Sequence, residues 1–574
     1  MQNFFPFAKW ISSYKKGDLG NDILAGFTVG IVLIPQGLAY AMIAGLPPIY
    51  GLYASLVPIL IYVFLGTSRQ LAIGPVAMDS LLVAAGLGAL SLTKTEDYIT
   101  MAILLAFMVG AIQFLLGLFR MGFLVNFLSK PVISGFTSGA AIIIIFSQIK
   151  HLLGADIAGS NKFIRLISNV FQKIAETNIY DLGIGLIGIT LILLFKRISR
   201  KIPAILVVVV LGVLAVYFFD LQRFGVKIVG EIPKGLPMFQ VPNVTTDNML
   251  SIWPIAVAIA LVGYLEAISI GKSLQEKNNE DTINANQELI ALGASNMLGS
   301  FFKSFPVTAS FSRSAINCES GAKTNLAAFF SMIMVVLTLL FMTPLFYYLP
   351  KAILASIIMV SVFGLIDLIY PRELWKHRKD EFLVLMVTFL CTIFIGIKEG
   401  ILIGVLFSLL LMVFRTSNPH FAVLGNVKDT DYYKNISRFG NEITIREDLL
   451  VVRFDAQLYF GNVGFFKTEL FKHIEAKGDK LKGVILNAEA INYIDSTAAQ
   501  MLANIIKDIH GQNLQFYVAG AIGPARDIIF SSGIIDELHR EFLFVKTVEA
   551  VTYFDEPKPI SILRAKVAHQ QNLE

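Results

Sequence analysis

The chain has 574 residues, of which 55% are hydrophobic and 16% charged, and its formal net charge is +5. A typical soluble domain is about one quarter charged, so the composition excludes a wholly soluble protein, and the small net charge gives no argument for nucleic-acid binding. Charged residues are unevenly distributed, since 32 of the last 134 residues are Asp, Glu, Lys or Arg. We therefore expect a large lipid-soluble part followed by a water-soluble module of domain size.

Apolar runs that approach the length of a membrane-spanning helix, about 20 residues, recur along the first part of the chain. The uninterrupted runs 140–146 and 205–216 contradict the alternating pattern of β-barrel strands, so we expect a polytopic helical membrane protein. A further segment over 306–318 is too short and too polar to span alone. The candidate spans are 23–45, 52–66, 74–92, 101–119, 132–150, 179–195, 203–219, 250–273, 289–302, 325–349, 351–369, 382–398 and 400–415.

Basic residues beside short loops predict the orientation, because Lys and Arg concentrate on the cytoplasmic side. They gather before the first span, between 195 and 203, and over 372–379. All three clusters lie on the same side of the membrane if the first span runs outwards and 306–318 is counted as a membrane crossing. The same count of crossings places 416–574 in the cytoplasm. The expected divisions are a cytoplasmic N-terminal segment 1–20, a transmembrane transport domain 21–417, a linker 418–440, a cytoplasmic α/β domain 441–556 and a C-terminal tail 557–574.

Two of these segments are interrupted near a proline, Pro75 and Pro306, at corresponding positions of two halves of the membrane part. Proline is tolerated in the first turn of a helix, and an interrupted helix survives in a membrane only where it lines a cavity or packs inside protein. Matched breaks are typical of inverted-repeat transporters, in which short helices direct free N–H groups at an anion. Two proline-kinked helices without a ligand are the alternative.

Three ionisable residues lie at mid-helix positions of these segments: Asp79, Glu266 and Arg313. A charge at the centre of a membrane helix costs about 2.5–3.5 kcal/mol on insertion scales and indicates a functional site. Arg313 lies beside Ser310 and Ser312 at a predicted helix start, an arrangement that fits an oxyanion clamp. Protonation of Glu266 or Asp79 would remove a charge that opposes the anion, which allows proton coupling. A buried Arg–carboxylate pair that only stabilises the bundle is the alternative.

Motifs with fixed spacing extend along essentially the whole membrane part. They are Pro35–Ala41, Pro48–Ser55 with Tyr62 and Gly66–Arg69, Gly74–Pro75, Asn286–Leu289 with Ala291–Gly293, Ser312–Ser314, and Lys323–Thr324. On these residues the chain resembles the SulP anion transporters, called solute carrier 26 in animals. The resemblance implies fourteen membrane segments in two inverted sevens, a core domain that moves against a gate domain, and a homodimer.

The resemblance places the substrate site between the starts of the third and tenth segments. It implies substrate-binding roles for Gln36, Tyr40, Val76, Ala77, Ser310, Phe311, Ser312 and Arg313. Glu266 occupies the position at which ion-coupled relatives carry a carboxylate. Asp79 departs from the family pattern, and it is a second candidate for coupling, through a proton or through Na⁺ held with hydroxyls such as Ser269.

The expected function is proton-coupled uptake of a small oxyanion, sulfate first, by alternating access in the inner membrane of a bacterium. Bicarbonate or dicarboxylate uptake, Na⁺ coupling, and an uncoupled exchanger or channel stay open. A membrane-anchored signalling protein is a candidate from another class.

From about Asn441 short strands alternate with helices, which predicts an α/β layer with a mainly parallel sheet. Ile494–Thr497 resembles the loop of a STAS domain, which ends most SulP proteins. Asp495 and Ser496 are predicted to cap a helix, with phosphorylation of Ser496, nucleotide binding or a cytoplasmic protein partner as the regulatory alternative. The sequence offers no phosphate-binding glycine loop, metal-ligand cluster or nucleophile–His–Asp set, so we expect no enzyme, cofactor or metal.

Overall fold

The computed structural model describes residues 17–88, 94–123, 129–157, 163–198, 203–278 and 283–557, and the single residues 6, 7, 11, 14, 90 and 92. Most of the predicted N-terminal segment and nearly all of the predicted tail lie outside these residues. The chain divides into two compact units, Met1–Ser408 and Leu409–Glu574. We describe each unit by itself.

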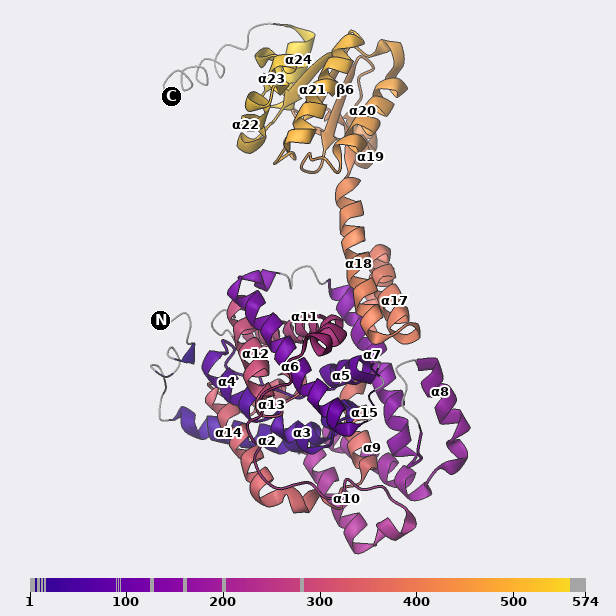
Figure 1. Cartoon of the computed structure of the whole chain (residues 1–574). Helices are drawn as coiled ribbons and strands as arrows, with labels where there is room; N and C mark the ends of the chain where they lie inside the picture. The colour runs from indigo at the N-terminus through magenta and orange to yellow at the C-terminus, as the bar shows by residue number, and fades with distance from the viewer. Residues whose placement is uncertain are drawn as a thin grey trace. The chain divides into compact units, whose positions relative to one another are not determined.

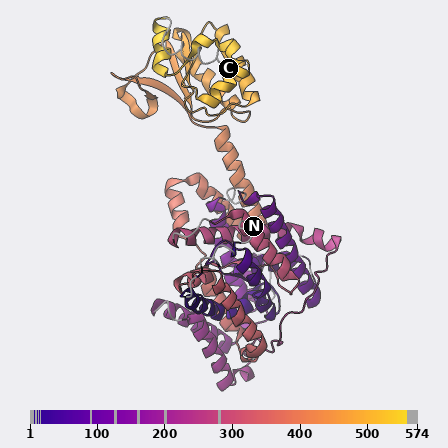
Figure 2. The same ribbon diagram turned by 90° about the vertical axis from the view of Figure 1, so that its left-hand side faces the viewer.

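Helices of the first unit pack into one bundle in both views (Figure 1, Figure 2). Each predicted span contains a helix, and the polar fragment 306–318 becomes a two-residue strand followed by a helix. The helices are α2 (Asp18–Ile43), α3 (Ile49–Tyr53), α4 (Val57–Leu65), α5 (Ala77–Gly88), α6 (Thr95–Leu118), α7 (Lys130–Leu152), α8 (Phe163–Gln172), α9 (Ile179–Ile198), α10 (Ala204–Phe218), α11 (Thr246–Asn278), α12 (Ala285–Ser300), α13 (Phe311–Glu319), α14 (Leu326–Leu337), α15 (Lys351–Phe363), α16 (Ile369–His377), α17 (Lys379–Phe394) and α18 (Ile397–Ser417).

Six helical stretches within the described residues are long and apolar enough to cross a membrane unaided. They are Asp18–Ile43, Thr95–Leu118, Lys130–Leu152, Thr246–Gln275, Leu326–Phe346 and Glu399–Ser417. Shorter apolar helices, α5 among them, make up much of the remainder. A helix of 12 residues such as α5 extends only about 18 Å, so it begins within the bundle rather than at a membrane surface.

Glycines allow pairs of helices to approach closely at two places. An added Cβ at Gly51 in α3 would overlap the backbone oxygen of Gly37 in α2. An added Cβ at Gly293 in α12 would overlap the backbone of Phe114 in α6. The sequence predicts packing rather than substrate contact for Gly51 and Gly293, and these contacts agree with that prediction.

The second unit is a mixed sheet with the strand order β4-β3-β6-β7-β8-β9, in which β5 pairs with β3. Its strands β6 to β9 are parallel, and β3 is antiparallel to β6. The strands are β3 (Phe421–Val427), β4 (Tyr433–Asn435), β5 (Ile443–Thr444), β6 (Leu449–Phe454), β7 (Gly483–Asn487), β8 (Gln515–Ala519) and β9 (Leu543–Phe544). The helices are α19 (Ile436–Phe439), α20 (Val463–Lys477), α21 (Ser496–Gly511), α22 (Gly523–Ser531), α23 (Ile534–Leu538) and α24 (Thr547–Asp555).

Both faces of this sheet are covered, which explains the nearly continuous apolar sequence of β6. Leu450 and Val452 face a core shared with α20 and α21, whereas Leu449 and Val451 face a smaller core shared with α24. Figure 1 shows α20 and α21 beside β6.

The sheet begins earlier in the chain than the sequence predicts. Residues 418–440 are predicted to be a linker, but Phe421–Val427 and Tyr433–Asn435 form β3 and β4. Strand β3 pairs with β6 from Phe421↔Phe454 to Leu424↔Val451. The cause is the exposed edge of β6, whose N–H and C=O groups need partners, and β3 supplies them.

Candidate anion-binding site

The two interrupted helices meet at a pair of short strands, β1 (Ile73–Gly74) and β2 (Thr308–Ala309). They pair antiparallel, with Ile73 opposite Ala309 and Gly74 opposite Thr308. Helix α5 follows β1 and α13 follows β2, so the helices leave the strand pair in opposite directions. The first N–H groups of each helix have no partner within that helix, and they begin on the two sides of this crossing. This antiparallel crossing is the arrangement that matched breaks in inverted repeats predict.

Arg313, in the first turn of α13, is completely buried beside this crossing. Its Nη1 donates a hydrogen bond of 3.2 Å to Oε1 of Gln36 in α2. Its Nη2 lies against Gly74, where an added Cβ would be only 3.3 Å away. In the described part of the chain, Nε and Nη2 have no hydrogen-bond partner. A buried guanidinium with free donors is an unsatisfied cation, which fits a site for an anion.

Two carboxylates belong to this region, Glu266 near Arg313 and Asp79 near Glu266, and neither forms an ion pair with Arg313 among the described residues. Asp79, in the first turn of α5, is 1% exposed and its Oδ1 has no hydrogen-bond partner there. Glu266 of α11 likewise has a buried, unpartnered Oε2. Glu266 interacts electrostatically with both Asp79 and Arg313. The alternative prediction, a direct Arg–carboxylate pair that stabilises the bundle, is therefore not what these residues form.

A cavity of about 190 Å³ opens beside these groups, lined mainly by α7 and α11. Glu266 and Ser269 contribute polar groups to its wall, and Phe311 closes it from the start of α13. At about 30 Å³ of liquid volume per water molecule, the cavity holds roughly six waters. That volume suits a small inorganic ion and excludes drug-sized ligands, whose pockets reach about 300–1,000 Å³.

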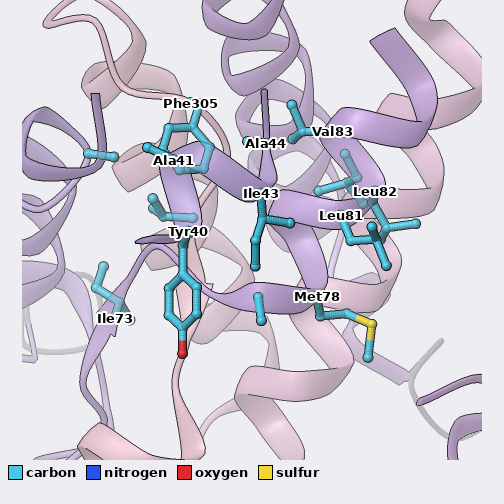
Figure 3. Packing of buried hydrophobic residues seen from close by; sticks show 14 of the residues in the cluster. Tyr40, Ala41, Ile43, Ala44, Ile73, Met78, Leu81, Leu82, Val83 and Phe305 are labelled. Atoms are coloured by element: carbon cyan, nitrogen blue, oxygen red, sulfur yellow. The ribbon is translucent and has the colours of Figure 1, made fainter. Parts of the chain in front are cut away.

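Among the other predicted site residues, Phe311 and Ser312 are exposed and the rest are buried. Tyr40, Val76 and Ala77 are at most 7% exposed, and Tyr40 belongs to a buried core with residues of α2 and α5, some of which Figure 3 shows. Phe311 is 59% exposed and lines the cavity.

Ser310 caps α13, because its Oγ accepts a hydrogen bond of 3.5 Å from the backbone N–H of Arg313. Oγ of Ser312 lies 3.3 Å from that of Ser310. The two hydroxyls therefore lie at the same helix start as the guanidinium.

Buried polar side chains that the sequence does not single out hold β2 in place. The side-chain amide of Asn296 in α12 accepts a hydrogen bond from the N–H of Val307 at 2.8 Å and donates one to its carbonyl at 3.0 Å. Oγ1 of Thr308 donates to the carbonyl of Gly263 in α11 at 2.6 Å. The sequence does contain a signal for Asn296, because this residue is polar and lies inside the apolar run 289–302.

Glu288 of α12 holds the turn that precedes β1. It accepts hydrogen bonds from the hydroxyl of Tyr62 at 2.9 Å and from the N–H groups of Thr67 at 2.7 Å and Ser68 at 3.1 Å. The sequence predicts that Glu288 satisfies a helix end rather than carries protons, and these bonds agree with a positioning role.

Comparison with known proteins identifies the family of this architecture. Residues 19–388 match the model of the sulfate permease family, and residues 441–550 match the STAS domain. The chain belongs to the sulfate permease family. It is therefore a membrane transporter and not an enzyme, as its sequence predicts.

Relatives of this sulfate permease family member align with nearly the whole length of the chain. "Sulfate transporter 4.1, chloroplastic" of Arabidopsis thaliana is 37% identical over 96% of this chain and 82% of its own length. "High affinity sulfate transporter 2" of Stylosanthes hamata is 32% identical over 96% of this chain and 87% of its own length.

Solved structures share the fold. The murine solute carrier 26 family member A9 in an inward-facing state is 27% identical, with a TM-score of 0.89 over 96% of this chain and 94% of that one. The transmembrane domain of the cyanobacterial bicarbonate transporter BicA, at 21% identity and a TM-score of 0.59 over 69% of this chain and 98% of its own, shares the fold alone. The predicted polytopic transporter with a C-terminal α/β STAS domain is thereby confirmed.

In the STAS domain, Asp495 is the N-cap of α21, because its Oδ1 accepts a hydrogen bond of 2.7 Å from the N–H of Ala498. Its Oδ2 also accepts one of 2.9 Å from the N–H of Phe460. The predicted capping role is therefore present. Ser496 is exposed at the first position of α21, and its regulatory role stays a prediction.

Proposed function

We propose that this transporter imports a small oxyanion, with sulfate as substrate, and that Arg313 is the central contact to the anion. The observation that carries the proposal is the free Nε and Nη2 of a fully buried guanidinium between two interrupted helix starts. Charge-assisted hydrogen bonds from a guanidinium are among the strongest contacts an oxyanion can receive. The plant relatives named as sulfate transporters support sulfate as the first candidate.

The remaining contacts of the anion would come from the strand crossing. The helix starts at Val76–Ala77 and at Ser310–Ser312 supply N–H groups and hydroxyls, and Phe311 would close the cavity side. Gln36 orients the guanidinium through its hydrogen bond at 3.2 Å. Tyr40 lies within electrostatic reach of Arg313 and Glu266, so its hydroxyl would complete the site.

Coupling would run through Glu266, with Asp79 as a second carboxylate. Moving one negative charge inward against 100 mV costs about 2.3 kcal/mol, and a divalent anion costs twice as much. Protonation of a carboxylate near the anion lowers both this cost and the local repulsion. Glu266 suits that role because it lines the cavity and has an oxygen without a partner in the described residues.

Uptake of labelled sulfate into proteoliposomes, with and without an acidic exterior, tests the proposal. We expect the acidic exterior to raise accumulation in the wild type and to raise it much less in Glu266→Gln, in which only Asp79 is left to carry a proton. Glu373→Gln, in the exposed part of α16, is the matched control and should behave as the wild type. Proton coupling through Glu266 is wrong if the pH gradient drives accumulation in the variant as strongly as in the wild type.

The same uptake assay separates the other candidate activities. An excess of unlabelled bicarbonate or fumarate that abolishes sulfate uptake would favour those anions. Replacement of Na⁺ by K⁺ tests Na⁺ coupling, and conductance without accumulation would indicate a channel. A phenotype that survives loss of all flux would favour the signalling alternative.

We also propose that the protein is a homodimer in the inner membrane of a bacterium, with its STAS domain in the cytoplasm. The basic residues between spans support this orientation, and the family resemblance supports the dimer. Native mass spectrometry of the full-length protein tests the dimer. Access of a protease to residues 441–557 only after membrane rupture tests the orientation.

A further inference from the structure

A second cavity, of about 350 Å³, lies away from the candidate anion site, where the ends of α2, α5 and α7 meet α8. Lys150 and His151, in the last turn of α7, line it together with Ser147 and Gln148. In the predicted orientation α2 and α7 both run outwards, so these helix ends face the exterior. We call this the outer cavity.

Lys150 is a half-buried cation without an anionic partner in the described residues. The charged groups that act on it electrostatically are Lys227 and Lys351, which have the same sign. Lys227 has its own partner, because its Nζ forms an ion pair with Asp156 at 2.5 Å. Two carboxylates lie beside Lys227: Asp156, its ion-pair partner, and the buried Asp181, which accepts a hydrogen bond from its backbone N–H. Three lysines therefore face two carboxylates, and the excess positive charge on a cation partly removed from water is unfavourable unless a further anion joins it.

The outer cavity is aligned with the candidate anion site along two shared helices. On α7, Thr137 lines the central cavity and Lys150 lines the outer one, a separation of about 20 Å at 1.5 Å per residue. On α5, Met78 lines the central cavity and Ala84 the outer one.

Between the linings of the two cavities, α7 contributes apolar side chains, whereas α5 contributes the buried polar residues Asp79 and Ser80. Ile143 and Ile144 of α7 belong to the same buried core as Leu82 of α5, and Figure 3 shows the neighbouring layer of Ile43, Leu81 and Leu82. The outer cavity thus ends against a buried layer of side chains that separates it from the central cavity.

We propose that the outer cavity is an entry site for the oxyanion, in which Lys150 binds the anion before the buried layer between α5 and α7 opens. The ligand is a small oxyanion with two or more acceptor oxygens, and the proposal rests on the proposed function for its substrate. A cation in a narrow mouth with low-dielectric walls raises the local concentration of an anion and its rate of capture. Lys150 is therefore a capture residue, distinct from the central contact Arg313.

A plain alternative is that Lys150 only extends its ammonium group to the lipid–water interface, as lysines near helix ends do. This alternative predicts no effect of Lys150 on the concentration dependence of transport. The two readings differ in a measurable quantity, the KM for external sulfate.

Initial uptake of labelled sulfate by intact cells that express the full chain provides the first test. We expect Lys150→Gln to raise the KM for external sulfate by about threefold or more, with the maximal rate nearly unchanged, and to weaken the dependence of KM on ionic strength. Lys173→Gln is the matched control, because it removes one exposed charge just after α8, where Lys173 pairs with Glu176 at 2.7 Å. An unchanged KM in Lys150→Gln, or an equal change in both variants, overturns the proposal.

Binding without transport provides a second test that does not depend on flux. In the Arg313→Gln variant, purified in neutral detergent, sulfate should still raise the melting temperature relative to chloride of equal ionic strength. The further substitution Lys150→Gln should abolish this rise, and Lys173→Gln should leave it. No sulfate-specific rise in Arg313→Gln, or one that survives Lys150→Gln, contradicts the outer site.

The phosphate headgroup of an anionic lipid is also an oxyanion, so it is the other ligand that could bind Lys150 in the outer cavity. If phosphatidylglycerol stabilises the protein through Lys150 and sulfate does not, the cavity holds a headgroup and the entry-site proposal is wrong. If the wild type takes up no sulfate but binds it through Lys150, the proposed function fails while the outer site stands.

Discussion

At the residue scale, Arg313 combines complete burial with incomplete hydrogen bonding. Gln36 accepts one hydrogen bond from Nη1, and the remaining guanidinium nitrogens are free in the described structure. Removing one partner of a buried, hydrogen-bonded charge pair costs about 2–5 kcal/mol, which corresponds to roughly 30-fold or more in affinity. We therefore expect Arg313→Gln to abolish measurable sulfate uptake.

Arg313→Lys separates charge from geometry at the same position. A lysine retains the charge as a compact ammonium, which cannot contact Gln36 and an oxyanion through a planar fork. We expect this variant to retain a small fraction of wild-type uptake at a higher KM. Full activity in Arg313→Lys would show that the guanidinium geometry is not needed, and full activity in Arg313→Gln would remove Arg313 from the site.

At the element scale, the crossing of β1 and β2 depends on a glycine that no other residue replaces without strain. Gly74 has a φ of +144°, and an added Cβ would lie 3.3 Å from Nη2 of Arg313 and 3.4 Å from Leu33. We expect Gly74→Ala to destabilise the protein by about 1–3 kcal/mol and to raise the KM for sulfate. Gly183→Ala in α9, where an added Cβ meets nothing within 4 Å, should lower neither stability nor uptake. Thermal unfolding and uptake kinetics of both variants check this expectation.

Strand β3 gives a second prediction at the element scale, in the STAS domain. A fragment that begins at residue 441 lacks β3 and β4, so the edge of β6 from Val451 to Phe454 loses its partner. Unpaired edges template aggregation. We expect a fragment over 418–557 to be monodisperse and to unfold cooperatively, and a fragment over 441–557 to aggregate. Size-exclusion chromatography and circular dichroism compare them, and a well-folded shorter fragment would contradict the role of β3.

Much of this architecture could be predicted because its signals are local. Apolar length predicts the spans, and the paired breaks at Pro75 and Pro306 predict two short helices with facing starts. The side-chain contacts that hold the two helix starts could not be predicted. The partners of Asn296, Glu288 and Gln36 are either remote in sequence or are backbone groups, which leave no pattern in the sequence. Strands β1 and β2 have two residues each, too few for any periodic pattern. The same limit applies to β4, whose three residues resemble a polar linker.

At the scale of the whole molecule, the net charge moved in each cycle decides whether membrane potential opposes uptake. Sulfate carries two negative charges, and the proposed site would contain one cation, Arg313, with two carboxylates, Asp79 and Glu266. If both carboxylates stayed ionised beside the anion, the group would carry three net negative charges in a low-dielectric interior, where repulsion between charges is strong. Two protons, one on each carboxylate, leave a single negative charge and make the transported set of two protons and sulfate neutral.

We therefore expect uptake by the wild type in proteoliposomes to be nearly independent of a potassium diffusion potential. Asp79→Asn removes one proton-binding group, so each sulfate would enter with one proton and one net negative charge. An inside-negative potential of 100 mV would then oppose the variant by about 2.3 kcal/mol, equivalent to a roughly 50-fold lower accumulation ratio. Glu373→Gln, which leaves both buried carboxylates in place, should retain the voltage independence of the wild type. Uptake by Asp79→Asn that ignores the potential would show that this carboxylate carries no transported proton.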